Sequence, residues 1–146
     1  MRFSLATIAA LTVATAAHAA PQVTAAWSRP AAQGTTAGGF MTLANPGAKP
    51  EVLVAVESPL ASGVQIHQSM MHGSTAMMHP VTQVPVPAGG SVTFAPGGYH
   101  LMFLQVSRPL KVGDTLPATL TFASGAKVKA AFVVGLAPPT APAAKR

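Results

Sequence analysis

Short apolar runs interrupted by proline and glycine limit most strongly what this chain can fold into. The sequence holds 14 Pro and 13 Gly, most of them between runs rich in Val, Thr, Leu and Phe. Helical periodicity appears nowhere after the first twenty residues. This pattern is typical of an antiparallel β-sandwich or barrel. The expected strands cover residues 23–27, 39–45, 51–57, 63–68, 77–84, 91–94, 100–106, 115–122 and 127–134.

The beginning of the chain is predicted to be an export signal rather than part of the fold. A positive charge at Arg2, an apolar run over residues 5–17 and the small residues Ala17 and Ala19 at the cleavage positions form a secretory signal peptide at residues 1–19. The run is too short for a membrane-spanning helix, which needs about 20 apolar residues. Cleavage before Ala20 predicts a periplasmic protein that does not insert into the membrane. The alternative is an uncleaved N-terminal anchor.

The remainder is expected to form one domain and a tail. Residues 20–136 have the usual length of a single domain and can bury a core without disulfides. Residues 137–146 contain mainly Pro and Ala before Lys145 and Arg146, and are predicted to be disordered because they offer nothing to bury.

Composition excludes several classes of function. With 0 Cys, the chain cannot form disulfides, cysteine-ligated zinc sites, iron–sulfur clusters or the His₂Cys site of blue copper proteins. The 3 acidic residues are Glu51, Glu57 and Asp114, too few and too scattered for a calcium cage or paired-carboxylate catalysis. Asp114 is the one aspartate and no Gly-x-Ser-x-Gly segment is present, which argues against a hydrolase. We predict that the chain is not an enzyme. The basic residues do not cluster with aromatic side chains, which argues against nucleic-acid binding.

Histidine and methionine gather in two places. Four of the 7 Met lie in residues 70–78, and every His beyond the signal lies in or beside this segment or on the strand at 100–106. His100 and Met102 are two apart on an expected strand, so both leave the same face while Leu101 and Phe103 point into the core. Imidazole and thioether donors without any thiol suit a soft ion such as Cu(I). The alternative is ordinary: methionine as core filler and histidine as a hydrogen-bonded structural residue.

A resemblance to a known family adds to this interpretation. The spacing of His67, Met78, His100 and Met102 resembles the metal-binding signature of the PCu(A)C family of periplasmic copper chaperones. The segments at 26–29, 37–45, 96–102 and 113–114 also resemble that family, and the similarity runs from about residue 25 to residue 134.

The resemblance implies a cupredoxin-like antiparallel β-sandwich with Greek-key connections. It implies that one Cu(I) is bound by His67, Met78, His100 and Met102. It also implies delivery of copper to the copper-site subunit of cytochrome c oxidase, alongside Sco-type thiol proteins.

The chain departs from the family pattern at several positions. Gln68 stands where the family has an acidic residue, and Met77 precedes Met78, so either methionine is a possible donor, with spacing favouring Met78. The tail lacks the His and Met residues that bind Cu(II) in some members. His72 and His79 are candidates for a weaker Cu(II) site, although the interpretation as exposed polar loop residues is favoured over it.

Two other functions stay open at this point. One is copper sequestration or resistance without a delivery partner. The other is a metal-free sandwich whose Met-rich loop contacts a protein partner. If copper binds, its affinity is expected to fall below about pH 6.5 as His67 and His100 take up protons.

Overall fold

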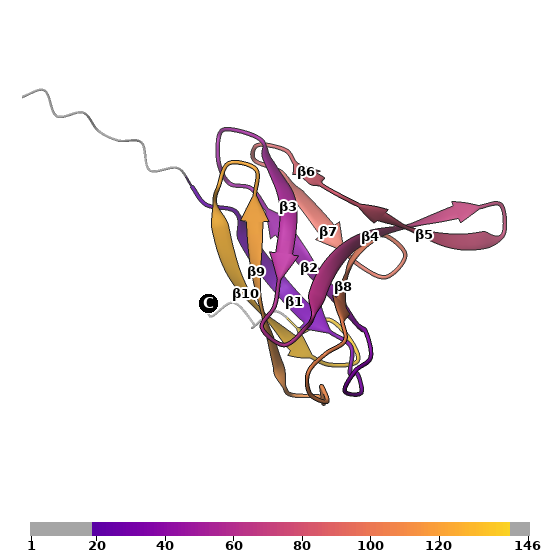
Figure 1. Ribbon diagram of the computed structural model, residues 1–146. Coiled ribbons are helices and arrows are strands. Elements are labelled where there is room, and N and C mark those ends of the chain that lie inside the picture. The colour runs from indigo at the N-terminus through magenta and orange to yellow at the C-terminus, as the bar shows by residue number, and fades with distance from the viewer. Residues whose placement is uncertain (1–18, 141–146) are drawn as a thin grey trace, which may run out of the picture.

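The chain folds entirely into strands over the part that the structure describes. The computed structural model describes residues 19–140, which form ten strands and no helix (Figure 1). The strands are β1 (Gln22–Ser28), β2 (Ala37–Ala44), β3 (Glu51–Glu57), β4 (Gly63–His72), β5 (Thr75–Val81), β6 (Val84–Val86), β7 (Ser91–Phe94), β8 (Tyr99–Leu104), β9 (Thr115–Phe122) and β10 (Lys127–Val134).

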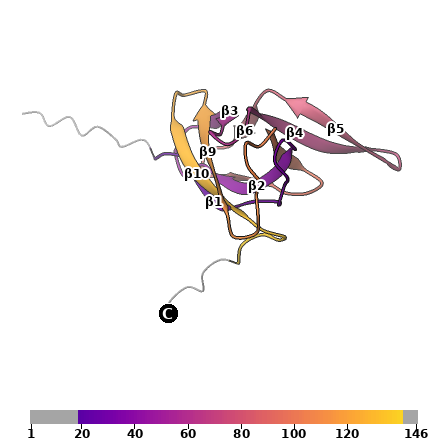
Figure 2. The ribbon, with the colours of Figure 1, turned by 60° about the horizontal axis from the view of Figure 1, so that its bottom comes forward.

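The strands form one continuous sheet in the order β5-β4-β8-β7-β2-β1-β10-β9-β3-β6. Neighbours are antiparallel except for β1 with β10 and a single parallel pair between β7 and β8. The sheet curves around one core, so that β3, near one end of the order, comes to lie beside β4, near the other (Figure 2). The predicted all-β, cupredoxin-like single domain is confirmed.

Alternation along the strands separates the core from the outer face. Leu101 and Phe103 on β8 have no exposed surface, whereas His100 and Met102 lie on the other side of that strand. On β10, Phe132 and Val134 are buried, whereas Ala131 and Val133 on the opposite face are exposed. Because successive strand residues face opposite sides, the core is built without using the histidines.

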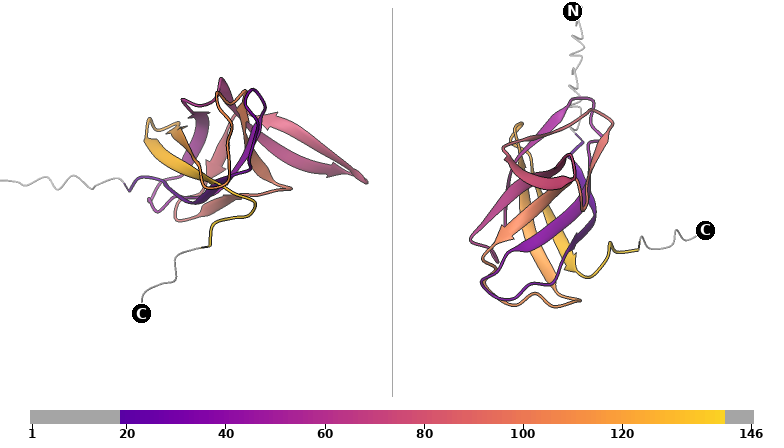
Figure 3. Two further views of the ribbon diagram at one scale, coloured as in Figure 1. Left: turned by 90° about the horizontal axis from the view of Figure 1, so that it is seen from below. Right: turned by 90° about the vertical axis from the view of Figure 1, so that its right-hand side faces the viewer.

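The Met-rich segment is where the strand prediction was wrong. Residues 69–76 were expected to form a loop, but β4 continues to His72 and β5 begins at Thr75. Only Gly73 and Ser74 form the turn, and Gly73 has φ +63°, which glycine adopts without strain. The resulting β4–β5 hairpin projects from the body of the domain (Figure 3). The expected strand 77–84 is divided into β5 and β6.

The predictions for the two ends are largely outside the described residues. Of the predicted signal peptide at residues 1–19, the structure describes only Ala19. Of the predicted tail at residues 137–146, it describes residues 137–140. Residues 135–140 contain no helix or strand. Between residues 19 and 140, no helix has the length and apolar character needed to cross a bilayer.

A bulge in β1 determines what covers the outer face of β2. Thr24 pairs with Thr42 and Trp27 pairs with Phe40, so β1 has one residue more than β2 between these pairs. Ala25 has φ +50° at this bulge. The extra residue turns Trp27 away from the core, where its ring lies 4.7 Å from the Phe40 ring.

Gly39 is required where β2 crosses the core. A Cβ atom at this position would lie 2.5 Å from Cε2 of Phe103, a side chain that is itself fully buried. A methyl group therefore cannot enter without moving the aromatic ring.

We expect Gly39→Ala to destabilise the domain by about 1–3 kcal/mol because it overpacks the core. Urea unfolding measures the change. Gly63→Ala is the matched control, since its Cβ would meet only Cδ1 of Leu104 at 3.9 Å. The control should shift stability by no more than about 1 kcal/mol. Equal effects of the two substitutions would contradict the argument.

Candidate metal centre

The four predicted donors come from three neighbouring strands. β4 lies between β5 and β8 in the sheet, with His67 on β4, Met78 on β5, and His100 and Met102 on β8. Segments that are more than twenty residues apart in sequence are therefore hydrogen-bonded neighbours in space.

The register between β4 and β8 places the two histidines opposite each other. His67 pairs with His100, and Gln65 pairs with Met102. Directly opposite residues of antiparallel strands lie on the same face, and so do residues two apart on one strand. His67, His100 and Met102 therefore share the outer face, with the imidazole ring centroids 5.6 Å apart.

The register between β4 and β5 distinguishes the two candidate methionines. Met78 pairs with Ser69, which lies on the same face of β4 as His67. Met77 pairs with Met70, which lies on the opposite face. Of the two, only Met78 therefore lies on the face that carries the other three predicted donors.

Hydrogen bonds leave one nitrogen of each imidazole free. Nδ1–H of His100 donates to the carbonyl oxygen of Gly98 at 3.2 Å, because that oxygen can only accept. Nε2–H of His67 donates to Oε1 of Gln65 at 2.9 Å. Within residues 19–140, Nε2 of His100 and Nδ1 of His67 are buried without a hydrogen-bond partner. A neutral imidazole held through one nitrogen while the other is free is the usual state of a metal-ligating histidine.

The turn before β8 fixes the orientation of His100. Gly97 has φ +88°, and the amide of Gly98 bonds back to the carbonyl of Ala95 at 3.0 Å. The Gly98 carbonyl also accepts the amide of Ser69 at 3.0 Å. The oxygen that holds the His100 ring is therefore anchored to β4.

Three of the four predicted donors line one pocket of about 380 Å³. Met78, His100 and Met102 share it with Arg29 and Phe40, and the guanidinium carbon of Arg29 lies 5.6 Å from the centre of the Phe40 ring. Arg29 is the one charged side chain among the lining residues. A pocket with a fixed cation and no carboxylate disfavours highly charged ions.

The composition of the site also limits which metal fits. Within the described part of the chain, no group of three or more His, Cys, Asp or Glu residues is placed to hold an ion. The other side-chain donors predicted for a metal at His67 and His100 are the thioether sulfurs of Met78 and Met102, which favour a soft ion over calcium, magnesium or zinc.

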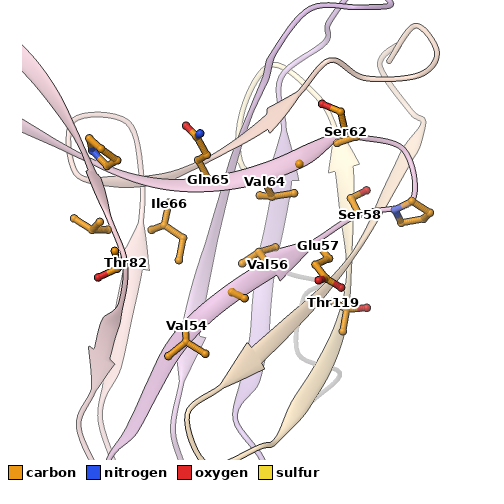
Figure 4. Close-up of a pocket in the computed structure, with 16 residues that line it drawn as sticks. Val54, Val56, Glu57, Ser58, Ser62, Val64, Gln65, Ile66, Thr82 and Thr119 are labelled. Carbon is orange, nitrogen blue, oxygen red and sulfur yellow. The ribbon is translucent and has the colours of Figure 1, made fainter.

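A larger hollow of about 880 Å³ lies between β3 and β4 (Figure 4). Its wall combines apolar side chains such as Val56 and Ile66 with hydroxyl groups such as Ser58 and Thr119. Glu57 is its one acidic residue, and neither histidine nor methionine lines it. This hollow therefore lacks the donors of a metal site.

Sequence reasoning missed the groups that hold the predicted donors. Gln65, which accepts from His67, lies two residues before it on the same strand face, so the alternation contained that signal. The Gly98 carbonyl and the Arg29–Phe40 wall depend on contacts between distant strands, and no local pattern indicates them.

The chain is similar to known proteins over most of its length. A family model described as "LpqE-like: Putative lipoprotein LpqE-like" matches residues 21–134. The chain is 33% identical over 105 residues to "Putative lipoprotein Lxx21020" of Leifsonia xyli subsp. xyli, an alignment that covers 71% of this chain. The chain spans 63% of the length of that relative.

Solved structures of similar fold include two PCuAC domains and DR1885. The apo PCuAC domain of PmoF1 has a TM-score of 0.66 at 26% identity, covering 81% of this chain and 95% of that domain. The copper-bound PCuAC domain of PmoF2 has a TM-score of 0.65 at 26% identity, covering 81% and 94%. Cu(I)-loaded DR1885 of Deinococcus radiodurans has a TM-score of 0.60 at 31% identity, covering 83% and 82%. The resemblance to the PCuAC family is confirmed.

The pKa of His67 is lowered from its ordinary value of 6.5, first by burial and second by the nearby His100. The unfolded chain therefore binds a proton at His67 more readily than the folded chain does. The folded state therefore loses stability relative to the unfolded state as the pH falls from above 6.5 toward the lowered pKa of His67 in the folded chain.

We therefore expect the metal-free protein to lose more stability between pH 7.5 and pH 5 than the His67→Gln variant loses. Urea unfolding at the two pH values measures this difference. The comparison with His67→Gln removes the contributions of the other histidines, which both proteins share. Equal losses in the two proteins would show that His67 is not responsible.

Proposed function

The chain belongs to the LpqE-like family, and from its set of His and Met donors and its likeness to copper-bound structures we propose that it is a periplasmic copper chaperone. In this proposal one Cu(I) is bound by His67, Met78, His100 and Met102 and is delivered to the copper site of cytochrome c oxidase. The similar PmoF2 domain is copper-bound and the similar DR1885 is loaded with Cu(I), which supports the choice of metal.

One observation carries the proposal: two buried imidazole nitrogens without partners lie on the strand face that also presents two thioethers. A buried nitrogen without a partner loses hydrogen bonds to water and gains nothing in return. A bound metal ion compensates for that loss. Neutral nitrogen and sulfur donors keep the total charge of the site low, which favours Cu(I) over Cu(II).

The unequal exposure of the donors supports a transfer function. Only 6% of His100 is exposed, whereas 58% of Met78 is exposed on the projecting hairpin. An incoming ligand of the acceptor protein therefore reaches the Met78 side first. In the proposed exchange the acceptor replaces the Met78 sulfur before the buried imidazole dissociates, so the ion is never free in solution.

The first test is a titration of the protein with Cu(I) against a chromophoric chelator. We expect His100→Ala combined with Met102→Leu to weaken Cu(I) binding by more than about 100-fold, because the loss of even a supporting group of a metal site costs about 10–100-fold in affinity. Unchanged affinity in this double variant would mean that the donors are wrongly assigned.

The neighbouring methionines provide a matched pair for the same titration. Met78→Leu removes a proposed ligand, whereas Met77→Leu removes a thioether from the other face of the hairpin. We expect Met78→Leu to lower the affinity for the Cu(I) ion bound with His67, His100 and Met102 about tenfold or more. Met77→Leu should leave that affinity unchanged. The reverse result would exchange the two assignments and would support the alternative donor.

Delivery is tested separately from binding. The Cu(I)-loaded protein is mixed with the metal-free copper-site domain of the oxidase, and the copper bound to each is measured after separation. We expect net transfer, and we expect a deletion strain to regain oxidase activity with the wild-type chain but not with the His100→Ala, Met102→Leu variant. Retained copper together with full oxidase activity in the deletion strain would favour sequestration or resistance. Sco-type thiol proteins belong in this assay as added partners.

A further inference from the structure

The outer half of the β4–β5 hairpin carries a second set of nitrogen and sulfur donors, on the face opposite the proposed copper site. Met70 pairs directly with Met77, and His72 and His79 lie two residues beyond them on the same face. None of these four residues belongs to the set formed by His67, Met78, His100 and Met102.

The two histidines of this face approach each other. The ring centroids of His72 and His79 lie 6.2 Å apart at an interplanar angle of 78°. The two histidines lie on different strands and at different distances from the turn. His72 pairs with Thr75 next to the turn, whereas His79 pairs with Gln68 farther from it. In the order of pairs along the hairpin, the Met70–Met77 pair lies between the two histidines.

Burial does not account for these methionines. Met70 is 47% exposed and Met77 is 44% exposed, on a hairpin that projects away from the body of the domain (Figure 1). Water therefore reaches this face, and neither side chain contributes to the buried core. Exposed apolar side chains grouped in this way usually mark a site of interaction.

The chemistry of the hairpin favours a soft cation. Residues 63–81 include no Asp, Glu, Lys or Arg, so the hairpin offers neither carboxylate oxygen nor a charge of its own. Calcium and magnesium require oxygen donors. Two imidazoles with two thioethers suit Cu(I).

We propose that Met70, His72, Met77 and His79 form a second Cu(I) site, on the face of the hairpin opposite the first. The two sites share the strands β4 and β5 but no ligand. The second site is more exposed than the first, and its ligands are held only by the hairpin. It therefore binds Cu(I) more weakly and exchanges it faster than the first site.

The test is an anaerobic titration of residues 20–146 with Cu(I) in the presence of a competing chromophoric chelator. We expect the wild-type protein to bind two equivalents, the second more weakly. His72→Ala with His79→Ala should reduce the stoichiometry to one without changing the affinity of the first ion. His100→Ala with Met102→Leu should remove the tighter ion and leave the weaker one, so the two sites fail independently.

Thioether binding is measured by NMR with Ag(I) as a diamagnetic substitute for Cu(I). We expect the methyl signals of Met70 and Met77 to shift with the second equivalent, and Met70→Leu with Met77→Leu to weaken that step about tenfold or more. All four substituted side chains are at least partly exposed on the hairpin, and circular dichroism checks that the variants fold. A wild-type protein that stops at one equivalent, or a second equivalent that survives either double substitution, overturns the proposal.

Discussion

The pairing of His67 with His100 across β4 and β8 is the constraint on which the candidate site depends. One position along, Ile66 pairs with Leu101, and both side chains are buried in the core. A slip of one residue would turn Ile66 to the outer face and His67 into the core, at a large cost in buried apolar surface. The hydrophobic core therefore fixes the register, and the register places the two imidazoles together.

Features that depend on a single strand could be predicted from the sequence. Alternation around His100 and Met102 predicted their common face correctly, and frequent Pro and Gly predicted an all-β domain. The choice between Met77 and Met78 could not be made in this way. It depends on a turn of only Gly73 and Ser74, in a segment of methionine, histidine and serine that has little intrinsic preference for strands.

Contacts between distant strands account for the features of the site that the sequence did not predict. The hydrogen bond from His100 to the Gly98 carbonyl requires that the turn at 96–98 lies against β4. The Arg29–Phe40 wall of the pocket depends on the bulge at Ala25, which brings Trp27 onto Phe40. Such features follow from how the sheet curves, which no local window of sequence contains. The bulge is also the point where simple alternation would have placed Trp27 on the wrong face.

The candidate donors are divided between the edge strand β5 and the inner strands β4 and β8, which combines fixed geometry with access. A site inside the core would hold its ion rigidly but would exclude a partner, whereas a site on a loop would be reached easily but would lack fixed geometry. Here His100 is held by the body of the domain, while Met78 stands on a hairpin that extends beyond it (Figure 3). The rigid strand provides orientation, and the exposed strand provides access. The proposed binding and release of a soft ion requires both properties in one site.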